Sequence, residues 1–122
     1  MDDIEKNIRV STLLDYYGAM LTEKQRNFIE LYYNEDLSLA EIAEHESISR
    51  QGVRDSIKHG EQILFELEDK LGIAGKADEY YRMNAEINTR ARNIRKLCGN
   101  NSPAGAEAAA IEKLTEEYKD LL

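Results

Sequence analysis

The sequence predicts an all-α protein: a helix-turn-helix domain followed by a C-terminal helical extension. Three observations predict this class. The 122-residue chain has one proline and no tryptophan, its apolar residues recur at steps of three and four, and serine or threonine residues that favour helix N-caps precede several of the apolar segments. This length suits one compact domain, or one small domain with an extension.

Two helices are expected before the helix-turn-helix core. Apolar residues at roughly helical spacing over residues 3–20 predict an amphipathic helix that ends near Gly18. Thr22 and Gln25 have the spacing of a capping box, which predicts the start of a second helix, and residues 34–36 end it. The apolar residues that define the first helix are Ile4, Ile8, Leu14, Tyr17 and Leu21.

Residues 38–59 have the pattern of a helix-turn-helix. Ser38 is a good N-cap for a short helix over 39–45, Ser49 is a good N-cap for the next helix, and a tight turn lies between them. Glycine is usual in such a turn where this chain has Ser47. The motif needs apolar or small residues where its two helices and turn pack together, and the residues that meet this need are Ile42, Ala43, Ile48, Val53 and Ile57.

One long helix over about 50–71 is predicted to contain the recognition segment and a packing seam at positions 53, 57, 64, 67 and 71, with Gly60 at the missing place. Gly72 and Gly75 are expected to interrupt it. The domain boundaries that follow are a helix-turn-helix domain over 1–72, a basic amphipathic helix over 73–98 that begins near Lys76 or Ala77, a linker over 99–105 and a last helix over 106–122.

Both helices of the extension repeat the seam spacing, which favours packing of helix against helix within one chain or across two. Because the extension has few intramolecular partners, a homodimer is favoured over a monomer. The seam residues are Tyr80, Asn84, Ile87, Ala91, Ile94 and Cys98 in the first helix and Glu107, Ile111, Leu114, Tyr118 and Leu121 in the second.

The first turns of the second motif helix should be exposed, where they can meet a DNA major groove. Arginine can bind guanine through two hydrogen bonds, glutamine can read adenine, and lysine or serine can hold phosphates. The candidate nucleic-acid-binding residues are Ser49, Arg50, Gln51, Arg54, Asp55 and Lys58.

The charge distribution argues against strong DNA binding by this helix. The net charge is -8, and residues 1–70 contain 8 basic and 16 acidic residues, whereas phosphate neutralisation supplies most nonspecific affinity. The alternative is therefore a solvated helix face whose basic residues pair with nearby acids. A second candidate site, for RNA, is the basic group Arg90, Arg92, Arg95 and Lys96, with pairing against the acidic half of the same chain as its alternative.

Other classes of protein find little support in the sequence. No apolar run approaches a membrane span and no signal segment opens the chain, so a cytoplasmic protein is expected. His45, His59 and Cys98 lack the spacing of a zinc site, no cofactor motif appears, and no nucleophile is paired with a base. We expect Cys98 to be a small buried apolar residue, and an enzyme is the least favoured class.

Residues 13–64, LLDYYGAMLTEKQRNFIELYYNEDLSLAEIAEHESISRQGVRDSIKHGEQIL, closely resemble the YlxM family of small bacterial helix-turn-helix proteins. The informative segments are TEKQRNFIELYYNEDLSLAEIA and ISRQGVRDSIK. The family in turn looks like region four of bacterial sigma factors. The resemblance implies a cytoplasmic regulatory protein associated with the signal recognition particle pathway.

Two classes of function remain open at this point. The first is a nucleic-acid-binding regulator, in which a dimer presents two recognition helices to DNA. The second is a protein-interaction accessory of the signal recognition particle GTPase or its RNA, in which the acidic half of the chain meets a basic partner without sequence-specific DNA binding. The target site and any effector are left open.

Overall fold

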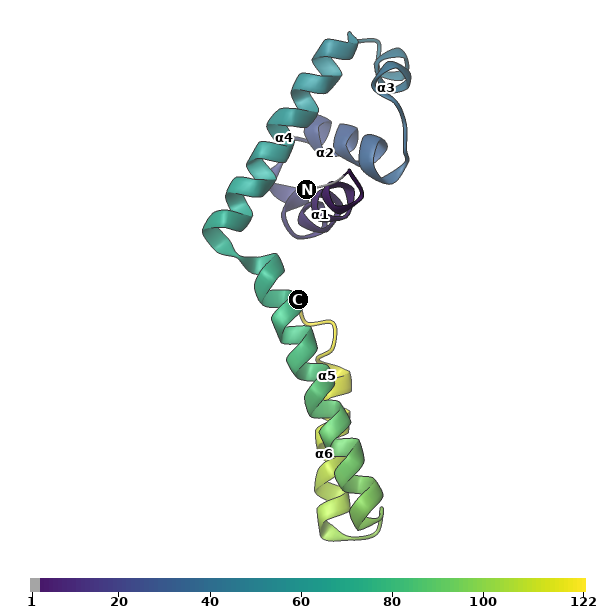
Figure 1. Ribbon diagram of the computed structural model, residues 1–122, viewed down its shortest axis with the longest axis vertical. Helices are drawn as coiled ribbons and strands as arrows, with labels where there is room; N and C mark the ends of the chain where they lie inside the picture. The colour runs from purple at the N-terminus through teal and green to yellow at the C-terminus, as the bar shows by residue number, and fades with distance from the viewer. Residues whose placement is uncertain (1–2) are drawn as a thin grey trace. The chain divides into compact units, whose positions relative to one another are not determined.

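The computed structural model describes residues 3–122, which form six α-helices and no strand (Figure 1). The helices are α1 (Asp3–Tyr17), α2 (Glu23–Ile29), α3 (Leu39–Glu46), α4 (Arg50–Leu71), α5 (Ile73–Cys98) and α6 (Pro103–Glu117). A short 3-10 turn, Gly18–Met20, follows α1, and a π-helical turn, Glu30–Asn34, continues α2. The all-α class predicted from the sequence is confirmed.

The chain divides into two compact units. The first ends at Ala74 and contains α1 to α4 with the first residues of α5, and the second runs from Gly75 to Leu122 and contains the rest of α5 with α6.

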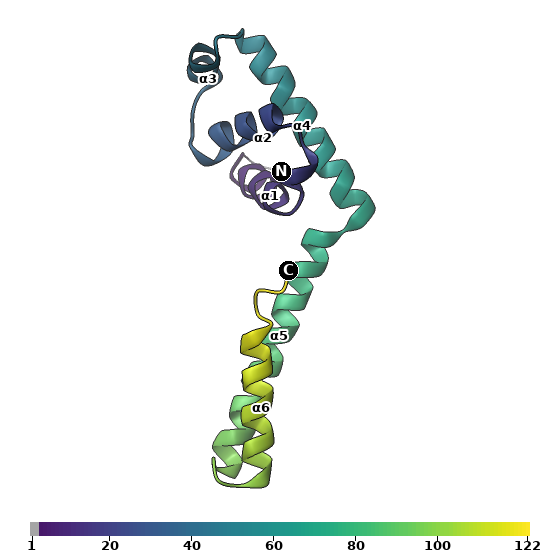
Figure 2. The same cartoon turned by 180° about the vertical axis from the view of Figure 1, so that it is seen from behind.

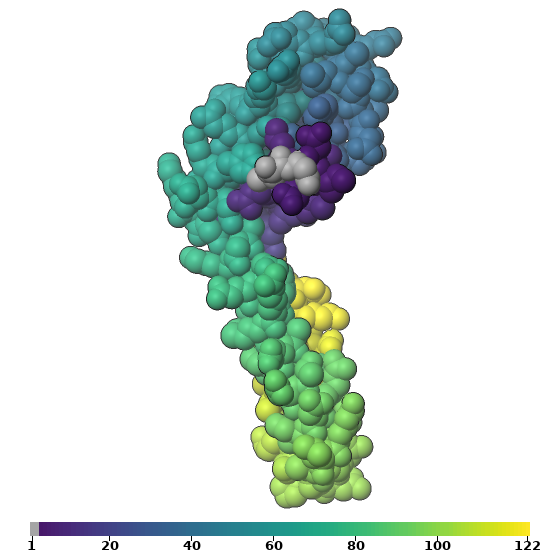
Figure 3. Space-filling model, viewed as in Figure 1, coloured from purple at the N-terminus to yellow at the C-terminus, as the bar shows by residue number. Residues whose placement is uncertain are grey.

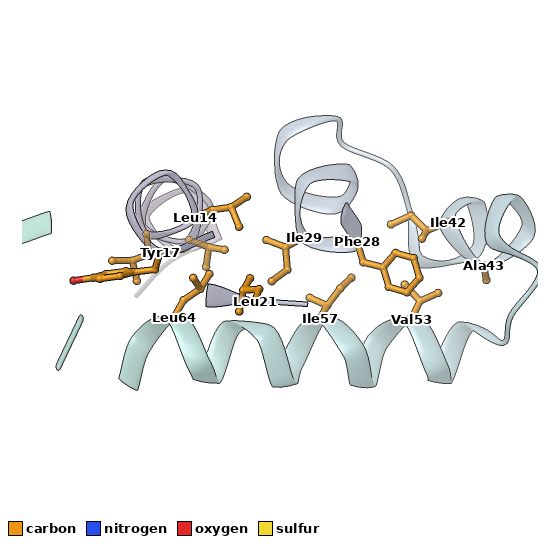
Figure 4. Packing of buried hydrophobic residues seen from close by; sticks show 12 residues of the cluster. Leu14, Tyr17, Leu21, Phe28, Ile29, Ile42, Ala43, Val53, Ile57 and Leu64 are labelled. Carbon is orange, nitrogen blue, oxygen red and sulfur yellow. The ribbon is translucent and has the colours of Figure 1, made fainter. Parts of the chain in front are cut away.

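The core of the first unit lies between α4 and the three helices before it. Val53, Ile57 and Leu64 project from one side of α4 toward α1, α2 and α3 (Figure 4). Gly60 lies on the same side and lets α2 approach closely, because a Cβ there would lie 2.6 Å from Cδ1 of Ile29. The expected α4 seam, with glycine in the place of an apolar residue, is therefore present from Val53 to Leu64, whereas Leu67 is only partly buried and Leu71 is exposed.

The packing predicted for the helix-turn-helix is confirmed. Ile42 and Ala43 of α3 are buried against Val53 and Ile57 of α4, and Ile48 in the turn packs on the same cluster. Apolar burial of about 1.5–3 kcal/mol per large side chain makes this contact the main force that holds α3 on α4.

Three N-caps expected from the sequence are also confirmed. Thr22 and Gln25 form a capping box at α2, and Ser38 and Glu41 form a second at α3. The Ser49 hydroxyl accepts the Gly52 N–H at 3.0 Å and caps α4. Each such cap stabilises its helix by about 1 kcal/mol.

The buried face of α1 differs from the one predicted. Its core residues are Val10, Leu13, Leu14 and Tyr17, whereas Ile4 and Ile8 are exposed. Since each residue turns the helix by about 100°, Ile4 and Ile8 lie on the side opposite Val10.

The α4–α5 junction lies at Gly72 and α5 spans Ile73–Cys98, as the predicted 73–98 segment has it, whereas the start near Lys76 or Ala77 and the interruption at Gly75 were wrong. Gly72 ends α4 in the left-handed region, at φ 62°, but α5 starts directly at Ile73 and continues through Gly75. The Tyr17 hydroxyl accepts the Ile73 N–H and Glu68 Oε1 accepts the Ala74 N–H, each at 3.0 Å. These contacts satisfy backbone donors at the start of α5, so the helix needs no cap within its own sequence.

The second unit is an antiparallel helical hairpin, visible from both sides in Figures 1 and 2. Its loop is shorter than the predicted 99–105 segment, and α6 spans Pro103–Glu117 where 106–122 was expected. Ser102 caps α6 by accepting the Gly105 N–H at 2.9 Å, and Pro103 occupies a first-turn position where proline is favoured.

The predicted seams of the extension pack within the chain only in part: Tyr80, Asn84 and Ala91 face α6, whereas the larger apolar seam residues do not. The hairpin buries small and polar residues, namely Ala77, Asn88 and Ala91 of α5 and Gly105, Ala108 and Thr115 of α6. Ile87 and Ile94 of α5 and Ile111 and Leu114 of α6 are exposed instead. Cys98 is exposed as well, so its assignment as a buried apolar residue was also wrong.

Candidate nucleic-acid interface

The turn between α3 and α4 sets the direction of the second motif helix. Ser47 adopts the left-handed conformation, with φ 56° and ψ 39°, and its N–H closes α3 on the Ala43 carbonyl. The Ile48 N–H binds the same carbonyl at 3.1 Å. Ser49 then caps α4 in extended backbone. The chain thereby ends one helix and starts the next within three residues.

The predicted contact residues Arg50, Gln51, Arg54, Asp55 and Lys58 are all exposed. Val53 and Ile57, between them in sequence, are buried in the core. Positions 51, 54, 55 and 58 share one side of the helix because of their three- and four-residue spacing. α4 forms an edge of the first unit along its length (Figure 3, teal).

Two of the predicted contact side chains have local partners. Ser49 uses its hydroxyl to cap α4. Gln51 Nε2 donates to Asp55 Oδ1 at 2.8 Å, so Asp55 orients the glutamine amide along the exposed face. One of the two Nε2 hydrogens and the carbonyl oxygen of Gln51 remain for a ligand.

The basic residues of this face are not paired with acids among the residues that the structure describes. Within residues 3–122, Arg50, Arg54 and Lys58 form no ion pair at 4.0 Å or less. The salt bridges expected under the alternative of a solvated, self-paired face are therefore absent from the part of the chain that the structure describes.

Two acids near this face in the sequence, Glu41 and Glu61, have partners elsewhere in the fold. Glu41 is held in its capping box. Glu61 is buried, accepts a hydrogen bond from the Tyr33 hydroxyl and lies 3.5 Å from Lys6 Nζ. Burial and the bond to Glu61 raise the pKa of Tyr33. Sequence reasoning missed this group because its members lie on three helical segments with no short-range signal.

The second candidate site is largely self-paired. Arg95 binds Glu112 through Nε at 2.6 Å and Nη2 at 3.0 Å, and this contact lowers the pKa of the Glu112 carboxyl. Arg92 donates twice to the Asn88 side-chain oxygen, and Arg90 pairs with Glu86 at 3.2 Å. Lys96 adds to the positive field at Glu112. Arg90 and Arg95 therefore pair with acids of the second unit, and not with the acidic first half of the chain that the alternative expected.

Over residues 3–122 no three His, Cys, Asp or Glu side chains converge on a possible metal position. No helix in this range has the length and apolar character needed to cross a membrane.

An all-α unit with two packed helices, a tight turn and an exposed basic face at the start of the second helix defines a helix-turn-helix protein. The chain belongs to the family UPF0122, "Putative helix-turn-helix protein, YlxM / p13 like", whose model matches residues 4–100.

Individual relatives agree with this assignment. The chain is 42% identical over 118 residues to a UPF0122 protein of Desulforamulus reducens, covering 93% of this chain and 96% of the relative. A Clostridium kluyveri UPF0122 protein is 61% identical over 70 residues, 57% of this chain and 63% of the relative. One from Bacillus thuringiensis is 48% identical over 84 residues, 69% and 76% of the two chains.

Proposed function

We propose that this protein is a regulator that binds nucleic acid, DNA in the first place, through the N-terminal half of α4. The observation that supports this most is the exposed row of Arg50, Arg54 and Lys58, which form no ion pair within residues 3–122. A helix in this position of the motif enters the major groove, where Arg50 and Arg54 reach guanine and Lys58 reaches a phosphate.

Arginines with no ion-paired acid suit this role for an electrostatic reason. Binding DNA does not require such a side chain to give up an existing ion pair. Three phosphate or base contacts per copy correspond to a slope of about -3 in log affinity against log salt concentration. The net charge of -8 opposes this attraction, so a single copy should bind weakly and two copies together much more strongly.

We place the protein in the cytoplasm and in the signal recognition particle pathway, which the YlxM resemblance implies. A homodimer would present two α4 helices to one duplex. The competing function is a protein-interaction accessory of the particle's GTPase or its RNA. The observation that favours it is the excess of acidic residues over residues 1–70, which would speed association with a basic partner.

The test is fluorescence anisotropy of the purified chain with labelled duplex DNA from the region upstream of its own gene and with the particle's RNA, each over a salt series. The informative variant is Arg50→Glu with Arg54→Glu. The matched control is Arg82→Glu with Lys113→Glu, the same charge reversal at two exposed positions of the second unit.

We expect saturable DNA binding that falls steeply with salt, a loss of at least about 100-fold in the α4 variant, and a much smaller loss in the control. DNA binding that survives the α4 change would overturn the assignment of this face. RNA binding alone, lost in Arg92→Glu with Lys96→Glu, would move the site to α5. No binding to either nucleic acid would leave the protein-interaction accessory.

A further inference from the structure

The second unit lacks an apolar core of its own. Its buried apolar residues are the alanines Ala77, Ala91 and Ala108. Its interior contacts are polar: Asn88 Nδ2 donates to Thr115 Oγ1 at 2.7 Å, and Asn84 Nδ2 donates to the Thr115 carbonyl at 2.9 Å. Units of about 40–70 residues need a disulfide, a metal or a partner when their own core is small, and the chain's single cysteine excludes an internal disulfide.

The large apolar side chains of this unit point outward in two stripes. On α5, the apolar stripe lies about 100° around the helix axis from the row of residues that packs on α6. On α6, the apolar stripe lies at about the same angle from the row that packs on α5. We call the six residues the hairpin apolar face: Met83, Ile87 and Ile94 of α5, and Ile111, Leu114 and Tyr118 of α6, each 37–55% exposed.

The two stripes lie on the same side of the hairpin. α6 runs antiparallel to α5, because Tyr80 binds the Tyr118 carbonyl, Asn84 binds Thr115 and Arg95 binds Glu112. On each helix, the apolar stripe is reached from the contact row by a rotation in the same sense about the N-to-C axis. Because the two right-handed helices are antiparallel and face each other, these two rotations lead to the same side of the hairpin. The opposite side contains polar positions such as Arg82, Thr89 and Lys113.

We propose that the hairpin apolar face is the dimer interface of this protein, and that it packs on the same face of a second copy to form a four-helix bundle. This inference rests on the homodimer of the proposed function but not on nucleic-acid binding. A hairpin with an apolar face two helices wide has the shape of half of such a bundle.

The exposed area matches what a stable dimer needs. At their exposed fractions, the six side chains leave on the order of 500 Å² of apolar surface per copy. A standard interface buries about 800 Å² per partner, of which about 65% is apolar in homodimers, or roughly 500 Å².

The charges next to the face favour a second copy over a partner of one charge sign. Arg90 lies between Ile87 and Ile94 on α5, and Glu107 lies one turn before Ile111 on α6. In a contact with twofold symmetry, each half of the interface contains one basic and one acidic residue of this pair. A uniformly basic or acidic partner would repel one of the two.

The polar seam inside the hairpin explains why the face stays outward. Arg95 with Glu112, and Asn88 with Thr115, each need a specific partner across the seam. Turning α5 to bury Ile87 and Ile94 against α6 would leave these groups without partners, which would destabilise the hairpin. The hairpin therefore fixes its own register and leaves the apolar residues for a second chain.

The first measurement is sedimentation equilibrium of the full-length protein over a wide concentration range. The expected mass is twice the 14.0 kDa of one chain. Leu114→Glu places a charge in the proposed interface and should raise the dimer dissociation constant by at least about 100-fold. Ala109→Glu makes the same charge change at an exposed position on the other side of α6 and should leave it within about threefold.

Ile87→Lys on α5 and its control Thr89→Lys repeat the comparison with the opposite charge, so a defect peculiar to one helix is recognised. A monomer at all concentrations overturns the proposal, as does a dimer that survives both interface variants. A stable complex only with an added protein of the secretion machinery would also overturn it.

DNA anisotropy on the monomeric variant separates the two proposals: a residual, salt-dependent, one-site affinity supports the α4 interface even when the dimer is lost.

Discussion

At the scale of single residues, the backbone of the motif turn offers a test of the fold. Ser47 has a φ of 56°, a conformation in which a side chain costs about 1 kcal/mol and glycine costs little. Ser47→Gly should therefore raise the free energy of unfolding by about 0.5 kcal/mol, after the extra freedom of glycine in the unfolded chain is subtracted. Urea unfolding of the two proteins measures the difference.

The reciprocal change is its control. Gly72 has a nearly equal φ of 62° at the end of α4, so Gly72→Ser should lower the free energy of unfolding by about 1 kcal/mol. Two changes of the same sign would contradict the left-handed backbone at one of the two positions.

Two tyrosines, the buried Tyr17 and the partly buried Tyr33, predict a dependence of stability on high pH. Burial and a hydrogen bond to a carboxylate raise the pKa of Tyr33 above its ordinary 10.0, and burial with the Glu68 contact raises that of Tyr17. A raised pKa in the folded state gives stability that is complete below pH 10 and lost as pH rises further, because the unfolded chain releases its proton first.

Tyr33→Phe removes one of these groups. The variant should be less stable than the natural protein at pH 8, because Glu61 loses its hydrogen bond, and the gap should narrow between pH 10 and 11.5. Urea unfolding at several pH values measures this gap. Tyr32→Phe, which removes the hydroxyl of the neighbouring exposed tyrosine, is the control, and a gap that stays constant for Tyr33→Phe would refute the linkage.

At the scale of helices, α2 and α4 approach each other closely at Gly60. A Cβ on Gly60 would meet Ile29 Cδ1 at 2.6 Å, and Ile29 is fully buried. Gly60→Ala should therefore destabilise the first unit by about 1–3 kcal/mol, despite the better helix propensity of alanine. Adding Ile29→Val removes the clashing methyl and should recover part of the loss. Purely additive effects in this double-mutant cycle would contradict the contact.

Helix starts were easier to predict than helix faces. Capping boxes need residues only three apart, so Thr22–Gln25 and Ser38–Glu41 are visible in the sequence. The start of α5 depends on Tyr17, 56 residues from the amide that it binds, and no local pattern reports such a contact. The outward orientation of the apolar face was not predictable for a related reason. The spacing of Ile87 and Ile94 predicts a row that packs on another helix, but it does not indicate which helix. The contact between α5 and α6 uses asparagine and alanine.

The candidate contact face of α4 was predictable because burial of Val53 and Ile57 determines what remains outside. Whether its cations are paired was not predictable. Acids within reach along the sequence, such as Glu61, point inward to Tyr33 in the fold. The electrostatic objection drawn from composition is therefore weaker than the count of charges suggests.

At the scale of the whole molecule, the two units of the chain differ in what stabilises them. The first buries twelve core residues around α4, whereas the second buries only alanines among its apolar residues and exposes its larger ones. Heating should therefore produce two transitions rather than one. If the second unit is folded by dimerisation, its transition alone responds to protein concentration by mass action.

Differential scanning calorimetry at two concentrations a factor of ten apart tests this. The transition of the second unit should rise by about 5 °C, and that of the first should stay within about 1 °C. Leu114→Glu should remove the concentration-dependent transition and leave the other in place, and Ala109→Glu should preserve both. Since Ser47→Gly acts only on the first unit, it should move the concentration-independent transition alone, which assigns each transition to its helices. A single concentration-independent transition would mean that the hairpin owes its stability to contacts within one chain.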